Sequence, residues 1–446
     1  MSLVRSATTP DVGATRLLDL ARPALDRRLD PSARAPIAVG MSGGGDSTAL
    51  MLAALAWARC AGRPVVALIV DHRLQPDSAV WAAAAAAAAR RRGADARVLV
   101  WEGDKPHAGL PAAARRARHA MLAGGARAAG ARVLLLGHTA DDLDEAAWMR
   151  GRGSTVSSPR EWAPSPAWPE GRELFLLRPW LGVRRAELRL ALGLAGEGWI
   201  EDPANGDLAY ARARARQALA QDPVRDLMRP DAGDGGLAAL ARLARCDAAG
   251  TVVIARRHLI DAGPGVAARF LAAASVCAGG GDRLPRTRQL VGLAARLGEG
   301  EPLVAGLAGA RLQAGEDLLV FREPGEARRA GAGALELPPG AVQVWDGRFE
   351  ALAESPGWSL RPLGGRMRRL PPAQRRGLRA LAAASRPVLP AASRGAELTC
   401  PILAGGGEVN LRSLVGARLA GTCGLIAQEA EVFATSHGVE AFGALS

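Results

Sequence analysis

The stretch SGGGDS, residues 42–47, follows directly after the apolar run IAVGM at residues 37–41. An apolar run of this length is typical of a buried strand, and residues 48–59 predict a helix. A strand, a glycine turn and a helix in this order make a cradle for phosphate groups. Glycines let the backbone turn tightly and aim N–H groups at an anion, and the helix adds its positive N-terminal end.

The loop differs from the common nucleotide loop GxxxxGK, which is followed by Ser or Thr. No lysine follows it, and Lys105 is the only lysine in the 446-residue chain. Asp46 instead places a carboxylate inside the loop, where it can hold Mg²⁺. A loop of this kind suits reaction at the α-phosphate of ATP, with pyrophosphate leaving; a glycine-rich turn without a ligand is the alternative. The loop resembles the SGGxDS signature of the PP-loop ATP pyrophosphatase superfamily, which implies adenylation of a substrate.

A second polar constellation, HTADDLDE at residues 138–145, follows the apolar strand expected at 133–137. If a helix begins near residue 140, Asp142 and Glu145 share one of its faces, and His138 stands beside them. Paired carboxylates near an imidazole can bind an ammonium group, hold Mg²⁺ or accept a proton. An acidic first turn that only caps a helix is the alternative, and proximity to the phosphate loop favours function.

The first 140 residues alternate between strand-like and helix-like segments, which predicts an α/β fold with a doubly wound, Rossmann-like parallel sheet. Ligands of such a sheet lie at the carboxyl ends of its strands. Asp71 and His72 end the second expected strand and are therefore candidates to line a nucleotide site. The expected strands are residues 37–41, 65–71, 97–101 and 133–137, and the expected helices are 48–59, 78–92, 110–129 and 141–149.

Three regions are expected along the chain. Residues 1–220 form the catalytic domain, with a loop rich in Gly, Ser and Pro at 150–172. A linker at 221–236 precedes a partly helical middle domain at 237–322. After a second break at 323–340, residues 341–446 form a small C-terminal domain with short strands.

Charge and composition narrow the partners and the compartment. The net charge is +13 and the sequence pI about 11.0, which favours either a polyanionic partner such as nucleic acid or a solvated arginine surface. Aromatic residues make up 4% of the chain, which argues against extended base-stacking surfaces. The five cysteines contain no CxxC pair, and no apolar run is long enough for a membrane span. A cytoplasmic protein in a reducing compartment is expected.

Two arginine groups are candidates for contacts with phosphates. Arg115 and Arg118 share a face of the helix expected at 110–129. Arg212, Arg214 and Arg216 alternate with alanine, so they spread around a helix if one forms there. A solvated basic face is the alternative for the first group, and compositional bias toward arginine is the alternative for the second.

These segments together resemble the tRNA(Ile)-lysidine synthase family over residues 37–216. Besides the loop and the histidine motif, the likeness includes Arg178-Pro179 and WIEDP at 199–203 with Asn205, Asp207 and Tyr210. Beyond residue 220 it is carried best by VWDGRF at 344–349, and it implies that the middle domain at 237–322 binds tRNA. The chain departs from the family pattern at Ala146, His119 and Ala213.

The resemblance implies that ATP adenylates C2 of the first anticodon cytidine of tRNA(Ile) with a CAU anticodon. The ε-amine of L-lysine then displaces AMP to give lysidine. Rival interpretations are another PP-loop tRNA-modifying enzyme, an amide-forming PP-loop ligase and a non-catalytic tRNA-binding paralogue. The sequence leaves open whether the chain works as a homodimer.

The expected site has three parts and one metal. The catalytic residues are Asp46, His138, Asp142 and Glu145; the ATP-binding residues are Ser42, Gly43, Gly44, Gly45, Asp46, Ser47, Asp71 and His72; the residues for tRNA or the lysine carboxylate are Arg115, Arg118, Arg212, Arg214 and Arg216; and Asp46 holds Mg²⁺.

Overall fold

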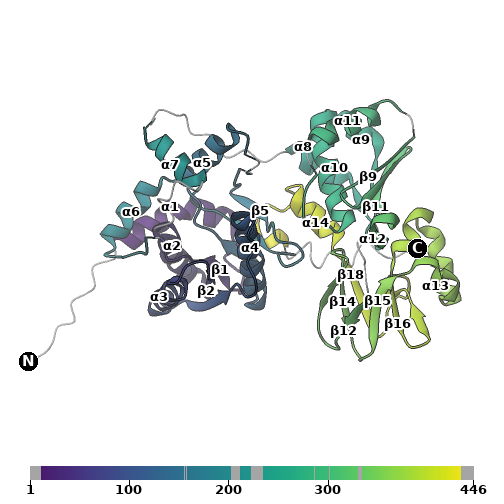
Figure 1. Ribbon diagram of the computed structural model, residues 1–446, viewed down its shortest axis with the longest axis horizontal. Coiled ribbons are helices and arrows are strands. Elements are labelled where there is room, and N and C mark those ends of the chain that lie inside the picture. Colours follow the sequence, from purple (N-terminus) through teal and green to yellow (C-terminus); the bar gives the residue numbers. More distant parts are fainter. Residues whose placement is uncertain are drawn as a thin grey trace, which may run out of the picture. The chain divides into compact units, whose positions relative to one another are not determined.

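The chain folds into two compact units (Figure 1). The structure is a computed structural model that describes residues 12–154, 156, 158–201, 211–221, 235–285, 287–300, 302–329 and 334–432. The first unit comprises residues 1–232 together with 427–433, and the second comprises 233–426 with 434–446. The expectations for Asp202, Pro203, Asn205, Asp207 and Tyr210, and for most of the linker at 221–236, lie outside the described residues.

The first unit is built on a six-stranded sheet. Its strand order is β3-β2-β1-β4-β6-β5, in which only the pairing of β5 with β6 is antiparallel. Its elements are α1 (Val12–Arg28), β1 (Ile37–Gly40), α2 (Gly45–Ala61), β2 (Val65–Asp71), α3 (Ser78–Arg91), β3 (Asp95–Val100), α4 (Leu110–Ala128), β4 (Val133–Leu135), α5 (Ala140–Arg150), β5 (Trp162–Pro164), β6 (Phe175–Leu177), α6 (Arg185–Leu194) and α7 (Ala211–Gln221).

The strand order places the two polar constellations side by side. β1 lies between β2 and β4, so the order reverses there, and ligands of open α/β sheets bind at such a switch point. Val39 of β1 is in register with Leu135 of β4. The loop after β1 and the histidine motif after β4 therefore leave the same edge of the sheet from neighbouring strands.

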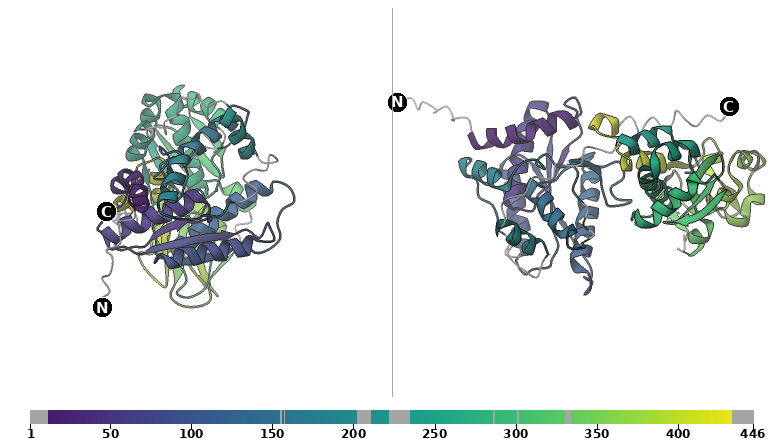
Figure 2. Two further views of the ribbon diagram at one scale, coloured as in Figure 1. Left: turned by 90° about the vertical axis from the view of Figure 1, so that its left-hand side faces the viewer. Right: turned by 90° about the horizontal axis from the view of Figure 1, so that it is seen from above.

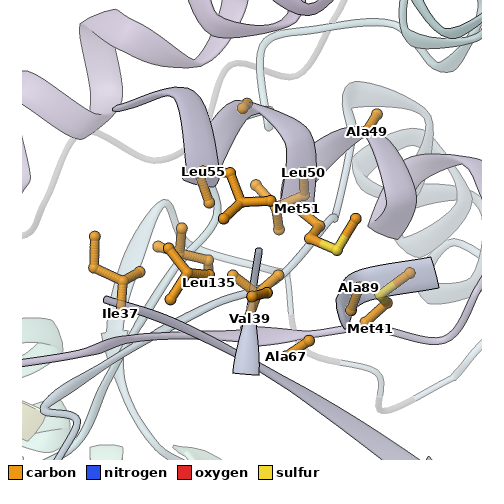
Figure 3. Packing of buried hydrophobic residues seen from close by; sticks show 14 of the residues in the cluster. Ile37, Val39, Met41, Ala49, Leu50, Met51, Leu55, Ala67, Ala89 and Leu135 are labelled. Atoms are coloured by element: carbon orange, nitrogen blue, oxygen red, sulfur yellow. The ribbon is translucent and has the colours of Figure 1, made fainter. Parts of the chain in front are cut away.

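Helices cover both faces of this sheet because its strands are apolar on both sides. On one face, Val39 and Leu135 pack against residues such as Leu50 and Met51 of α2 (Figure 3), and α1, α3 and α6 extend this core. On the other face, Ala38 and Leu134 pack against α4 through Leu122, Ala123 and Ala126. Figure 2 shows the two-sided arrangement from two further directions. The predicted doubly wound α/β fold is confirmed.

Several elements differ from the sequence-based expectation. α1 and the two strands β5 and β6 were not predicted, and β5 lies inside the segment expected as a loop. β5 has only three residues, ends in proline and pairs on one side, so its sequence carries little strand signal. β4 ends at Leu135, two residues before the expected boundary at 137.

The second unit contains three sheets, with orders β7-β8-β11-β10-β9, β12-β15-β16-β17 and β13-β14-β18. No helix of the described residues is long and apolar enough to cross a membrane. The helices are α8 (Gly235–Leu243), α9 (Arg256–Asp261), α10 (Gly263–Gly279), α11 (Thr287–Gly298), α12 (Pro324–Arg329), α13 (Pro372–Gly377) and α14 (Val415–Thr422). The strands are β7 (Arg245–Cys246), β8 (Val252–Ala255), β9 (Leu303–Leu307), β10 (Ala310–Ala314), β11 (Asp317–Arg322), β12 (Leu335–Leu337), β13 (Gln343–Trp345), β14 (Phe349–Ala353), β15 (Trp358–Pro362), β16 (Pro390–Arg394), β17 (Glu397–Thr399) and β18 (Val409–Ser413).

The VWDGRF motif at 344–349 builds a buried ion cluster in this unit. Asp346 accepts hydrogen bonds from Arg322, at 3.0 and 3.1 Å, and from Arg348 at 2.9 Å. Arg348 is almost fully buried and also donates to the carbonyl of Val388. The motif is therefore structural, because each charge in it is buried and paired.

Candidate active site

The loop at residues 42–47 forms a tight turn at the start of α2. Gly43 has φ of +86°, a conformation that favours glycine, and it packs against the side chain of Ile200. Ser47 Oγ donates to the Gly44 carbonyl at 2.9 Å and accepts from the Ser42 N–H at 3.1 Å. No side chain caps α2 at Gly44, which leaves the positive end of the helix available to an anion.

The histidine motif approaches this loop closely. A Cβ at Gly137 would lie 3.0 Å from the carbonyl oxygen of Asp46, so the missing side chain lets the two segments meet. Thr139 is the N-cap of α5, and its N–H donates to Asp142 Oδ2 at 2.9 Å. Asp142 therefore caps α5. This is the role that the alternative interpretation gave to the acidic first turn. The other oxygen of Asp142 is engaged elsewhere in the site.

Arg185, the first residue of α6, joins the two segments. Its guanidinium contacts Asp46 at 3.0 Å, Glu145 at 3.4 Å and Asp142 at 3.6 Å. Its backbone N–H donates to Asp141 at 2.9 Å. The side chain of Arg185 is mostly buried, so one cation balances three carboxylates that come from α2 and α5.

α7 supplies two further cations to the same carboxylates. Arg212 pairs with Asp142 at 3.2 Å and Arg216 with Glu145 at 2.6 Å, because residues four apart lie on one face of a helix. Arg214, between them in the sequence, is exposed. α7 lies beside α5 (Figure 1), which brings Arg212 and Arg216 to the carboxylates.

The carboxylates have different electrostatic environments. Burial raises the pKa of Asp46, and Arg185 opposes that rise. Burial and the nearby charge of Asp142 raise the pKa of Glu145. Burial also acts against ionisation of Asp142, but His138, the Thr139 N–H, Arg185 and Arg212 together lower its pKa. Glu145 Oε2 is buried and has no hydrogen-bond partner among the described residues.

His138 lies next to Arg178, in the segment that follows β6. Arg178 Nε donates to His138 Nδ1 at 3.3 Å, and Arg178 also donates to the carbonyl of Arg160 at 2.8 Å. Burial, followed by the charge of Arg178, holds the pKa of His138 well below its usual range. The imidazole is therefore neutral near pH 7, with its Nδ1 accepting and its proton on Nε2.

Arg115 and Arg118 of α4 contribute positive potential near His138. Burial lowers the pKa of both guanidinium groups, and the charge of Arg212 lowers it further. The charge of Arg115 also lowers the pKa of Arg118. Arg118 in turn lowers the pKa of His72, after burial, and that of His138. The charge of Arg118 therefore acts on both the histidine motif and the end of β2.

The two polar residues at the end of β2, Asp71 and His72, differ in their contacts. The carboxylate of Asp71 is buried and accepts the N–H of Arg73 at 2.9 Å, which stabilises the turn after the strand. His72 stands edge-on to Trp101, at 5.9 Å between ring centroids. His72 Nδ1 is buried without a hydrogen-bond partner among the described residues. Of the pair, His72 is the one that retains an unused polar atom.

Sequence reasoning missed Arg185 and the role of Arg178. A usable signal for Arg185 is its position at the start of α6, where a cation is unfavourable beside the positive end of the helix dipole unless anions neutralise it. No local pattern shows which anions these are, because Asp46 and Glu145 lie 139 and 40 residues away.

A family model, two relatives and one solved structure are similar to this chain. The PP-loop domain family matches residues 18–222. A tRNA(Ile)-lysidine synthase of Caulobacter vibrioides is 50% identical over 92% of this chain and 99% of its own length. One from Rhizobium meliloti is 33% identical over 76% of this chain and 77% of its own. The U34-tRNA thiolase NcsA of Methanococcus maripaludis, 13% identical, aligns with 47% of this chain and 73% of its own at a TM-score of 0.38.

A parallel sheet with the SGGGDS loop at its switch point, opposed by the histidine motif on the neighbouring strand, defines a PP-loop ATP-binding enzyme. Both matches are longer than the first unit, so the similarity to the Caulobacter and Rhizobium proteins extends into the second unit. The chain belongs to the tRNA(Ile)-lysidine synthase family.

Proposed function

We propose that this chain uses ATP to join L-lysine to C2 of the first anticodon cytidine of tRNA(Ile) with a CAU anticodon. The C2 oxygen of cytidine attacks the α-phosphate of ATP, and pyrophosphate leaves. The ε-amine of lysine then attacks C2, the C–O bond to AMP breaks, and lysidine forms. Ser42, Gly43, Gly44, Gly45 and Ser47 hold the phosphates at the open end of α2.

The observation that carries the lysine half of this proposal is the unused oxygen of Glu145. Glu145 Oε1 is already held by Arg216 and Arg185, while Oε2 is buried and has no partner in the part of the chain that the structure describes. A buried carboxylate oxygen without a donor is costly, and an ammonium group is a donor that fits it. Lysine must lose a proton before attack, since its reference pKa is near 10.4. The raised pKa of Glu145 suits it to receive that proton.

The hydrogen bond from Arg178 assigns a different task to His138. Its Nδ1 is engaged as an acceptor, so its Nε2–H is a donor to substrate oxygen rather than an acceptor for the lysine proton. Asp142 keeps the motif in place by capping α5 and by pairing with Arg212. In this proposal Glu145, rather than His138, accepts the proton of lysine.

The residues of the loop fit a magnesium ion bound together with ATP. Mg²⁺ is commonly held by one or two carboxylates plus substrate phosphates, and Asp46 offers a partly exposed carboxylate beside the phosphate loop. When bound, the ion neutralises charge that develops on the phosphates. Arg185 shares this carboxylate and must yield at least part of that contact to the metal.

Two features favour this reaction over a sulfur-transferring PP-loop enzyme. Burial raises the pKa of Cys246 to about 12 and that of Cys277 to about 11, which keeps both as unreactive thiols. Among the described residues no group of three or more His, Cys, Asp or Glu side chains is placed to hold a metal ion.

Exposed arginines of the second unit, including Arg368, Arg369, Arg375 and Arg376, are proposed to bind the tRNA backbone.

Incubation with ATP, labelled lysine and total tRNA is expected to give AMP and pyrophosphate together with lysidine. The physical reason is the absence of a γ-phosphate lysine beside the loop. Nucleoside mass analysis of digested tRNA and chromatography of the spent nucleotide measure both products. ADP as the main tRNA-dependent product, or label in a nucleoside other than lysidine, would contradict the proposal.

Glu145→Gln is expected to raise the KM for lysine at least tenfold and to change that for ATP little. The amide keeps the shape of the side chain but loses the charge that binds ammonium, and such a charged hydrogen bond is worth about 1.5–3 kcal/mol. Steady-state kinetics with each substrate varied in turn measure the two constants. Glu187→Gln is the control, since that carboxylate caps α6. Equal changes in both constants would assign Glu145 to the nucleotide instead.

A further inference from the structure

A short segment far along the chain is part of the ATP-binding unit. Residues 427–432 follow α14 of the second unit but pack with the first unit. Within them, Glu431 accepts the N–H groups of Ala427 and Gln428, the latter at 3.1 Å, and so fixes the start of the segment. We call residues 427–432 the strap.

The strap is anchored by a fully buried ion pair. Both terminal nitrogens of Arg63 donate to Glu429, each at 2.7 Å, and neither side chain is exposed. Glu429 also accepts the N–H of Asp30 at 3.0 Å. Arg63 is held in turn by the carbonyls of Ala35 and Asp30, at 2.9 and 3.1 Å. The arrangement is a preformed binding site for the Glu429 carboxylate, because the fold holds each of its donors in place.

From the strap, a chain of contacts leads to the catalytic histidine. Arg28 donates to the carbonyl of Ala427 and to Glu161, both at 2.8 Å. The backbone of Glu161 accepts the N–H of Arg178 at 2.8 Å, and Arg178 Nε donates to His138 Nδ1. Each link is a charged group or a backbone hydrogen bond, so the contacts form a continuous connection from Ala427 to His138.

We propose that the strap, seated by Glu429 on Arg63, positions His138 through Arg28, Glu161 and Arg178. Glu429 and Arg28 are then positioning residues: neither touches the reacting groups, and both act through the Arg178–His138 contact. The inference rests on the proposed function only where kcat is measured. The melting temperature and the spectrum of His138 test the inference independently of that function.

The anchor is tested first, by heat denaturation of the full chain. Glu429→Gln leaves the cation of Arg63 buried without its counter-charge, and loss of one partner of a buried pair lowers the melting temperature by on the order of 10 °C in a unit of this size. Glu431→Gln, which changes an exposed carboxylate of the same strap, is the control and is expected to lower it by less than half as much. Equal shifts in the two variants would overturn the anchor.

The positioning role is tested by a matched pair of arginine variants. Arg27 and Arg28 both pair with Glu161, but no contact joins Arg27 to the strap in the described residues. We expect Arg28→Met to lower kcat about tenfold with the KM for ATP unchanged, and Arg27→Met to lower it less than twofold. If the two variants lower kcat equally, the strap does not position the site.

A spectroscopic measurement separates this inference from the proposed reaction. The ¹⁵N resonances of the His138 imidazole report which ring nitrogen carries the proton. The wild-type chain is expected to show the Nε2–H form, and Arg28→Met a mixture with the Nδ1–H form. An unchanged spectrum in Arg28→Met would overturn the inference, even if lysidine forms. A changed spectrum in Arg28→Met, together with no lysidine from the wild-type chain, would support the inference and refute the proposed function.

Discussion

Asp46→Asn is expected to reduce lysidine formation at least a hundredfold, while the affinity for tRNA stays within about twofold. Asp46 is the carboxylate of the phosphate loop, so its loss removes the group proposed to hold Mg²⁺ beside the phosphates. Loss of a group that stabilises charge developing in a transition state typically costs about 10²–10³ in rate. Single-turnover kinetics measure the adenylation step, and filter binding measures tRNA affinity.

Asp144→Asn is the matched control for this substitution. Asp144 pairs with Arg184 at 2.6 Å on the outer side of α5, so its loss removes an ion pair without touching the loop. The control is expected to keep at least half of the wild-type rate. An Asp46→Asn variant that retains more than about a tenth of the rate would exclude a metal role worth ~1.4 kcal/mol or more.

Arg185→Met is expected to lower lysidine formation at least a hundredfold as well. The substitution leaves Asp46, Asp142 and Glu145 close together without the cation that now contacts all three. Repulsion among partly buried carboxylates then disturbs both the metal position and the ammonium position. Rates with saturating ATP and lysine, together with the melting temperature, measure the loss of activity and any loss of stability separately.

Arg184 provides the control, because it precedes Arg185 and pairs with Asp144 outside the carboxylate cluster. Arg184→Met is expected to change the rate less than threefold. Arg185→Lys keeps the charge but not the fork that reaches three partners, so it is expected to recover only part of the activity. Wild-type rates in Arg185→Met would show that the three carboxylates need no counter-charge from α6.

The fold was predictable where the signal is local. The strands at 37–41 and 65–71 are almost entirely apolar, which a sheet buried on both faces requires, and the helix between them begins after Gly44. The three-residue strand β5 was not predictable, since it ends in proline and pairs with β6 only because the sheet already exists.

The candidate site divides in the same way. The sequence by itself determined the phosphate loop and the carboxylates Asp142 and Glu145, because their chemistry depends on residue type and on spacing within one turn. Only the tertiary structure brought Arg185 to Asp46 and Glu429 to Arg63, pairs that are 139 and 366 residues apart. Such pairs leave no periodic trace in the chain, because the energy that selects them arises only when folding buries both charges together.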